Sequence, residues 1–309
     1  AVRSAYEAGV ARRRGGDLRG EARALLSVAR LRSQAAGLPA LEGGIANGAE
    51  VGAEVAASAT EAAASASPAT EALAMFVEAG DRRGAAEAAL QIAAELFQAA
   101  RTEDAMEAVE QALPHLEFLG DREGMAEALR WASASLLAAG ATARASAVAS
   151  RAVGCHRQAG GQQRLGFGMA LLMVARAELA AEAGADSIAQ RLRVRRALEA
   201  SQEAAAVLSG AGERRAAALE LVARCSLLEY DSGGAASAAR GAFQAYEEAR
   251  DHKGMGAACL LAAKAYALRR QAGPSQSAAK RAMDHFGRCG HSVGLDEARS
   301  LAGPGALAR

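Results

Sequence analysis

Large aromatic side chains and prolines are scarce in this sequence, and so are the residue types that favour strands. Aromatic residues make up 4% of the 309 residues and prolines number five, whereas hydrophobic residues make up 51%, many of them alanine. An alanine-rich chain with few prolines and few β-branched residues favours helices over strands. Because small side chains let two helices approach closely, we expect an all-α structure with tightly packed helices.

The sequence also lacks an excess of either charge and a long apolar run. Its 36 basic residues nearly balance its 35 acidic residues, so no overall field attracts the chain to nucleic acid or to an anionic membrane surface. No apolar run approaches the roughly 18 residues of a membrane-spanning helix. We therefore expect a soluble chain with protein partners, without a nucleic-acid ligand and without a membrane span.

Cysteines are few and lie far apart, at Cys155, Cys225, Cys259 and Cys289. A chain of this length does not need disulfides for stability, so we interpret the four as reduced thiols. This interpretation predicts an intracellular, reducing compartment, which is either the cytoplasm or an organelle interior. The N-terminus has no signal-peptide pattern and does not begin with methionine, so we interpret the chain as a processed or trimmed form.

Motifs for catalysis and metal binding are either missing or better explained in another way. The stretch YDSGG at 230–234 resembles the nucleophile region of trypsin-like proteases, but it lacks the leading glycine. The stretch HFGRCGH holds His285, Cys289 and His291, but no fourth zinc ligand is evident. No nucleotide fingerprint, serine elbow or metalloprotease motif is present. We predict no catalytic residue, no cofactor and no metal, and hence a protein that is not an enzyme.

A short glycine-bounded phrase recurs along the chain. GDRRG at 80–84 returns as GDREG at 120–124, and degraded copies lie at 160, 212, 250 and 290, at intervals of 40, 40, 52, 38 and 40 residues. Such a period indicates stacked structural repeats. The first residue of each copy is called the anchor below. Gly80 and Gly120 suit the left-handed conformation that ends a helix, and the following aspartate can cap the next helix. A phosphate loop would need more glycines and a preceding strand.

Each anchor is preceded by a helical stretch with side chains of fixed size. An alanine stands eight residues before every anchor, and another small residue stands seven residues before most of these alanines. The side chain four residues before each anchor is larger. The small pairs are Ala105 and Ala112, Ala145 and Ala152, Ala197 and Ala204, Ala235 and Ala242, and Ser275 and Ala282. The larger residues are Phe76, Leu116, His156, Leu208, Tyr246 and Phe286. Each unit is therefore predicted to be a helix, a short turn and a second helix that ends at an anchor.

These helix pairs resemble tetratricopeptide repeats (TPRs), in which small residues of the second helix recur at a spacing of seven. Large residues stand where the TPR first helix carries its bulky side chain, at Leu96, Leu136, Leu228 and Tyr266. The longer period is similar to that of kinesin-light-chain-like adaptors, whereas the tryptophan and terminal proline of the family are largely missing. The resemblance covers 68–302. It implies a right-handed α-solenoid of about seven antiparallel helix pairs plus a C-terminal helix, with a groove that binds a protein or peptide.

Two regions depart from this regular pattern. Residues 1–67 are predicted to form irregular helical repeats, of which 43–67 is either a helix or a low-complexity linker. Residues 68–309 form the array proper, and its 52-residue unit is predicted to contain an extended helix at about 186–209, several turns longer than its counterparts. Four arginines crowd its first half, at Arg191, Arg193, Arg195 and Arg196. They form either a solvated face or a basic surface for an acidic partner.

These features favour a non-catalytic scaffold for protein–protein interaction, such as a structural or assembly subunit of a multi-protein complex. The alternative is the ligand- or peptide-sensing repeat portion of a larger signalling or transcription regulator, although no effector or DNA-binding helix pair is recognisable. Replacing the four arginines with alanine is expected to weaken partner binding without unfolding the chain, because exposed charges contribute little to stability.

Overall fold

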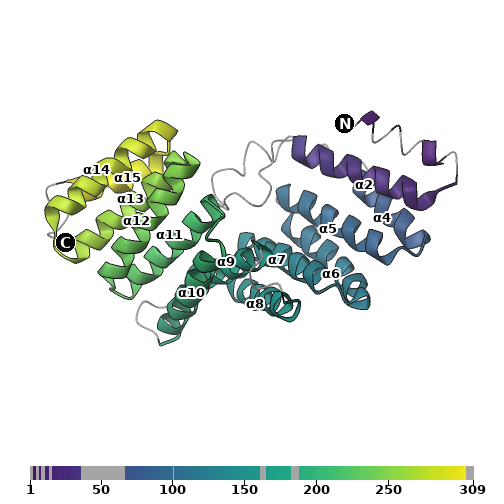
Figure 1. Cartoon of the computed structure of the whole chain (residues 1–309), viewed down its shortest axis with the longest axis horizontal. Helices are drawn as coiled ribbons and strands as arrows, with labels where there is room; N and C mark the ends of the chain where they lie inside the picture. Colours follow the sequence, from purple (N-terminus) through teal and green to yellow (C-terminus); the bar gives the residue numbers. More distant parts are fainter. Residues whose placement is uncertain are drawn as a thin grey trace. The chain divides into compact units, whose positions relative to one another are not determined.

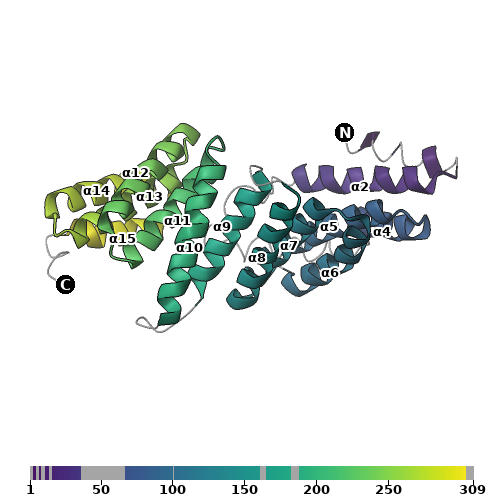
Figure 2. The same ribbon diagram turned by 60° about the horizontal axis from the view of Figure 1, so that its bottom comes forward.

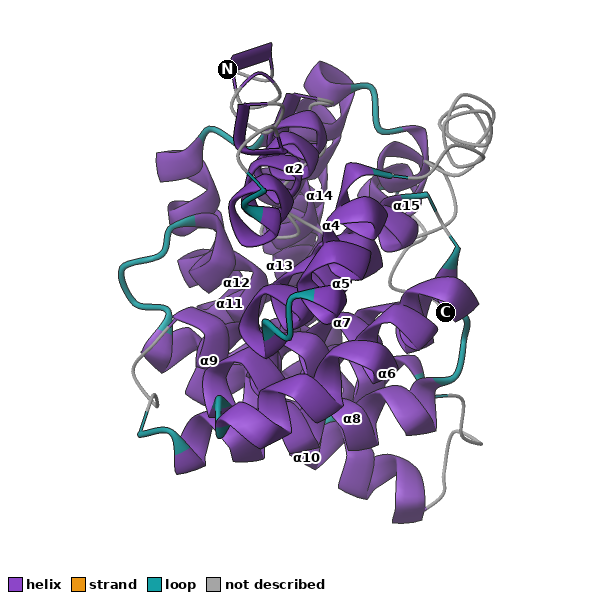
Figure 3. Cartoon of the chain, turned by 90° about the vertical axis from the view of Figure 1, so that its right-hand side faces the viewer, coloured by secondary structure: helices purple, strands orange, loops and turns teal. Residues whose placement is uncertain are grey.

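A computed structural model of the chain shows helices joined by short turns. The structure describes residues 16–35, 67–99, 101–160, 165–181 and 188–303, together with residues 3, 4, 7 and 11–13. Every regular element in these ranges is a helix, which confirms the all-α prediction (Figure 3). The chain divides into two compact units, unit 1 at Ala1–Gly161 and unit 2 at Gln162–Arg309. Residues 43–66, for which helix and linker were the alternatives, lie outside the described ranges.

In unit 1, two or three residues separate each helix from α4 to α8 from the next, so that these consecutive helices run antiparallel. Each helix from α4 to α8 packs against the next one within this unit, and α2 packs against α4 and α5 (Figure 1). The helices are α2 (Leu18–Ala35), α4 (Pro68–Glu78), α5 (Arg82–Gln98), α6 (Thr102–Leu119), α7 (Arg122–Ala138) and α8 (Thr142–Gln158).

Unit 2 continues the alternation of first and second helices. Its first helices, α9, α11, α13 and α15, contact one another in that order, and the second helices α10, α12 and α14 each pack against the first helices on either side of them in the chain (Figure 2). The bounds are α9 (Leu165–Ala180), α10 (Ile188–Val207), α11 (Glu213–Leu228), α12 (Ser232–Ala249), α13 (His252–Leu268), α14 (Ala272–Cys289) and α15 (Ser292–Ala302).

The recurring phrase ends one helix and starts the next, as its residues predict. Gly80 and Gly120 have φ angles of 67° and 65°, in the left-handed region that glycine adopts without strain. Asp81 then accepts a hydrogen bond from the backbone N–H of Gly84 at 3.0 Å, and Asp121 accepts one from Gly124 at 2.9 Å. Both carboxylates therefore cap the following helix, and the phrase is a structural connector.

The small residues of the second helices lie at closely packed contacts. Their side chains are between 0% and 2% exposed, and this holds for Ala105, Ala112, Ala145, Ala152, Ala197, Ala204, Ala235, Ala242, Ser275 and Ala282. The larger residues four before the anchors are also buried, with exposures between 1% and 7%. Each second helix thus contributes small side chains where helices approach and one large side chain near its end.

The α10 helix, Ile188–Val207, lies where the extended helix was predicted. This helix has 20 residues, against 17 or 18 in α6, α8, α12 and α14. In the described residues α10 exceeds its counterparts by less than one turn, and the extended helix at about 186–209 stays a prediction. Residues 182–187, between Ala181 and the start of α10 at Ile188, lie outside the described ranges.

Candidate functional site

The outer face of α10 combines arginines with exposed aliphatic side chains. Ile188 and Leu192 are 78% and 55% exposed, whereas the opposite side of the helix is buried. Arg191 and Arg195 are exposed on the same side, because residues three and four apart share one face of a helix. We call these four residues the α10 face. Arginine is enriched at protein interfaces, and exposed aliphatic side chains beside it supply apolar area that a partner can bury.

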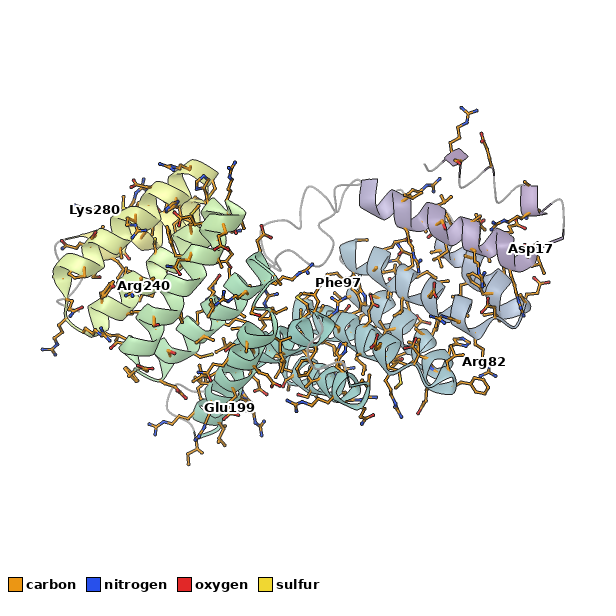
Figure 4. All side chains as sticks on the ribbon, in the orientation of Figure 1. Asp17, Arg82, Phe97, Glu199, Arg240 and Lys280 are labelled. Carbon is orange, nitrogen blue, oxygen red and sulfur yellow. The ribbon has the colours of Figure 1, made fainter. Side chains whose placement is uncertain are left out.

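The four predicted arginines have different surroundings. Arg195 forms an ion pair at 3.4 Å with Glu199, which is labelled in Figure 4. The Arg196 guanidinium lies 4.0 Å from the carboxylate of Glu178 on α9, whose side chain is only 9% exposed. Arg193 is half-buried and has partners of its own. The structure therefore places Arg191 and Arg195 on the α10 face, while Arg196 contributes to the contact between α9 and α10.

A cluster of charged and polar groups lies among α9, α11 and α12, with a buried tyrosine, Tyr246, and an exposed arginine, Arg224. The Tyr246 hydroxyl donates a hydrogen bond to Oε2 of Glu220 at 3.0 Å, and Arg224 forms an ion pair with Glu220 at 2.7 Å. Burial lowers the pKa of Arg176 on α9, and the Glu220 carboxylate partly opposes this shift. Burial also raises the pKa of the Tyr246 hydroxyl, and the charge of Glu220 acts in the same direction. The Glu220 carboxylate therefore pairs with Arg224 and also acts electrostatically on the nearby Arg176.

The predicted site residues do not include this cluster, although the repeat pattern carries a signal for it. Glu220 stands eight residues after its anchor, and in four other first helices that position holds a buried alanine, at Ala88, Ala128, Ala258 and Ala298. Burying a carboxylate at this position costs free energy unless the carboxylate has hydrogen-bond or ion-pair partners. The hydroxyl of Tyr246 supplies one such partner, whereas Phe76 and Phe286 hold the equivalent position without a polar atom.

The motifs considered for catalysis and metal binding have structural roles. In YDSGG, Asp231 caps α12 by accepting hydrogen bonds from the backbone N–H groups of Gly233 and Gly234 at 3.1 and 2.9 Å. In HFGRCGH, the Nδ1 atom of His291 accepts a hydrogen bond from the backbone of Gly294, while His285 contacts His252. Among the described residues, no three or more His, Cys, Asp or Glu side chains are grouped so that they could hold a metal ion.

The four cysteines are free thiols, and three of them are buried. Burial raises the pKa of the Cys225 thiol to about 12, with Glu229 acting in the same direction. Burial also raises the pKa of Cys259. Cys289 is exposed. Over the described part of the chain, the helices are too short or too polar to span a bilayer.

Comparison with solved structures identifies the fold. The crystal structure of BtubC (BKLC) from P. vanneervenii matches with a TM-score of 0.62 and 13% identity, over 77% of this chain and 91% of that chain. A putative kinesin light chain of Podosopora anserina with nearly identical TPR-like repeats matches with a TM-score of 0.53 and 15% identity, over 66% of this chain and 95% of that one. This chain has the TPR-like helical-repeat fold.

Another structure with this fold is a Rap protein complexed with the competence and sporulation factor. It matches with a TM-score of 0.50 and 13% identity, over 76% of this chain and 67% of that chain. Neither a family model nor a curated protein matches the sequence. The predicted TPR-like all-α solenoid architecture is thus confirmed at the level of fold, at 13% to 15% sequence identity to these solved structures.

Proposed function

We propose that this TPR-like chain is a non-catalytic scaffold for protein–protein interaction, and that it serves as a structural or assembly subunit of a multi-protein complex. The α10 face is the observation that carries this proposal. Ile188 and Leu192 expose apolar surface at the outer side of an otherwise regular amphipathic helix. Burying such side chains against a partner supplies affinity, because each contributes about 1.5–3 kcal/mol when it leaves water completely.

The charges on this face indicate an acidic partner surface. Arg191 and Arg195 are one turn apart and both are exposed, so they can engage two carboxylates of a partner at once. Arginine presents a planar fork of donors that matches a carboxylate with two hydrogen bonds. Arg195 is already close to Glu199, so a partner carboxylate competes with an exposed and weak internal ion pair.

The proposal is tested in two steps on the full chain. A photo-crosslinking amino acid at Leu192 should capture the partner in the native host, whereas the same group at Val77, which is exposed in unit 1, should not. The affinity of the purified partner is then measured for the wild type and for Arg191→Glu/Arg195→Glu. We expect a loss of at least about tenfold at low salt and a smaller loss at high salt, because screening weakens exposed charges.

Arg240→Glu is the matched control, since Arg240 is an exposed arginine on another second helix of unit 2 (Figure 4). Arg196 is left unchanged, because its contact with Glu178 joins α9 and α10. Unaltered affinity of the folded Arg191→Glu/Arg195→Glu variant would rule out the α10 face as the binding surface.

The alternative proposal is a repeat portion that senses a ligand or peptide for a larger regulator. The cluster of Arg176, Glu220, Arg224 and Tyr246 favours it, because two guanidinium groups with one carboxylate are suited to an anionic group of a ligand. A library of acidic peptides screened by titration tests this alternative. Arg224→Ala should then abolish binding, while Arg191→Glu/Arg195→Glu should leave it intact. The reverse pattern supports the scaffold.

A further inference from the structure

Three of the five histidines lie at the C-terminal end of unit 2, at His252, His285 and His291. They belong to α13, α14 and the turn before α15, three helices that pack against one another. Each of the three makes a contact that depends on the protonation state of its imidazole ring. The His291 contact therefore makes the start of α15 sensitive to protonation of a histidine, and the His252–His285 contact does the same for the packing of α14 on α13, to which α15 docks.

His291 caps the N-terminus of α15. Its Nδ1 atom accepts a hydrogen bond from the backbone N–H of Gly294 at 3.0 Å. Asp81 and Asp121 hold the same position before α5 and α7, and their carboxylates accept the equivalent bond. A carboxylate accepts at any pH near neutrality, whereas Nδ1 accepts only when it carries no proton. Protonation of His291 would remove the acceptor and place a positive charge at a helix N-terminus, where the helix dipole disfavours it.

His252 and His285 form a pair between α13 and α14. Their Nδ1 atoms are 3.3 Å apart, and the rings are stacked with centroids 5.6 Å apart. One Nδ1 has to donate and the other has to accept, so the pair cannot keep this contact when both rings are protonated. His252 is also the first residue of α13, where a cation is again unfavourable. The Phe243 ring on α12 packs edge-to-face with the His285 ring, with the two ring centroids 5.7 Å apart.

The helix that these contacts hold is short and depends on its neighbours. The α15 helix has 11 residues, and isolated helices of that length are marginal in water. It docks through an apolar cluster in which Ala298 packs with Cys259, Leu260 and Phe286. The Phe286 ring lies so close to Gly294 that an added Cβ would come within 2.7 Å of it. Loss of the cap therefore acts on a short helix whose remaining hold is this apolar packing together with the ion pair of Glu297 with Lys264.

The remaining charged groups on the helices packed around these histidines include both cations and carboxylates. On α15, Asp296 pairs with Arg299 at 3.0 Å, and Glu297 pairs with Lys264 of α13 at 2.5 Å. Burial, the charge of His252, and then Arg288 and Arg281 lower the pKa of His285, and only Asp284 opposes them. The other charged groups on the helices packed here are Asp251 and Lys253 at the start of α13, Lys280 on α14, and Arg240, Glu247 and Glu248 on α12.

We propose that protonation of these histidines releases α15 from the C-terminal end of unit 2. The helix stays docked while the histidines are neutral and undocks when they are protonated. Burial lowers the pKa of His285, so the folded state favours the neutral form of this ring. The stabilisation is thus fully present above the ordinary histidine range, about pH 6.5, and is lost as the pH falls below it. Release exposes Leu260 and Phe286.

Amide hydrogen exchange of the full chain tests the proposal, with rates corrected for the intrinsic effect of pH. When the pH is lowered from 7.5 to 5.5, the protection of residues 292–302 in the wild type should fall by at least about fivefold. This is the effect expected when a helix loses one N-cap. In His291→Asp, which installs the cap found before α5 and α7, the fall should be smaller. Protection of α7, which Asp121 caps, serves as the internal reference.

The double variant His291→Asp/His285→Met removes both pH-dependent contacts. Methionine is the residue at the position of His285 before the first anchor, at Met75, where it packs against a buried cluster, so the substitution is compatible with the fold. The double variant should keep its α15 protection at pH 5.5. A fall of equal size in the wild type and in the double variant would overturn the proposal, and so would constant protection in the wild type.

Discussion

The ring of Phe76 lies directly over the α-carbon of Gly84, so that a Cβ atom added at this glycine would come within 2.3 Å of the ring. The same relationship joins Tyr246 to Gly254, also at 2.3 Å. In each case a large side chain near the end of a second helix fills the space that the glycine leaves on the next first helix. The second glycine of the recurring phrase therefore allows close packing, while the first allows the left-handed turn.

Gly84→Ala should destabilise unit 1 by about 1–3 kcal/mol, because the ring of Phe76 has to move out of a closely packed core. Thermal or urea unfolding of the full chain measures the change. Gly154→Ala is the matched control in the same unit, since no atom lies within 4 Å of a Cβ added to Gly154 in α8. This control should stabilise the unit by about 0.5–1 kcal/mol, because alanine is the better helix former. Equal effects of the two variants would contradict the packing role of Gly84.

Asp121→Ala should reduce the stability of unit 1 by about 0.5–2 kcal/mol, because the backbone N–H of Gly124 loses its acceptor at the start of α7. Asp121→Asn should have a much smaller effect, since the amide oxygen of asparagine also caps a helix. Chemical denaturation of both variants provides the comparison. If asparagine proves as destabilising as alanine, the carboxylate acts through its charge rather than through this hydrogen bond.

The buried thiols predict a pH dependence at the alkaline end. Because burial raises the pKa of Cys225 to about 12, the folded state favours the neutral thiol. The resulting stabilisation is fully present below the ordinary thiol range and is lost as the pH rises from about 9 towards 12. The difference in unfolding free energy between the wild type and Cys225→Ala should therefore shrink between pH 7.5 and pH 10.

Alkylation of the native chain at pH 8 gives an independent check on the thiols. Cys289 is exposed and should react rapidly, whereas Cys225 and Cys259 should react only after unfolding, because both are buried as neutral thiols. Mass spectrometry of the labelled peptides distinguishes the sites. Rapid native labelling of Cys225 would show that α11 opens far more readily than its packing indicates.

The sequence by itself determined the helical class, the repeat period and the ends of most helices. These features depend on interactions within a few residues. Glycine at Gly120 adopts a left-handed conformation that other residues avoid, and Asp121 reaches a backbone N–H only three residues away. Alanines seven residues apart share one face of a helix because of helix geometry alone. Such short-range features can be recognised in the sequence wherever the local pattern repeats.

Only the tertiary structure decided which charged and polar side chains meet. The Tyr246 hydroxyl finds Glu220 across 26 residues of sequence, and His252 meets His285 across 33. Arg196 proves to be a partner of buried Glu178, whereas Arg191, five residues away, faces outwards. These pairings depend on how each helix is rotated against its neighbours, and that rotation follows from the packing of all their side chains together. A local pattern names the residues on each face, but only the assembled helices bring two faces into contact.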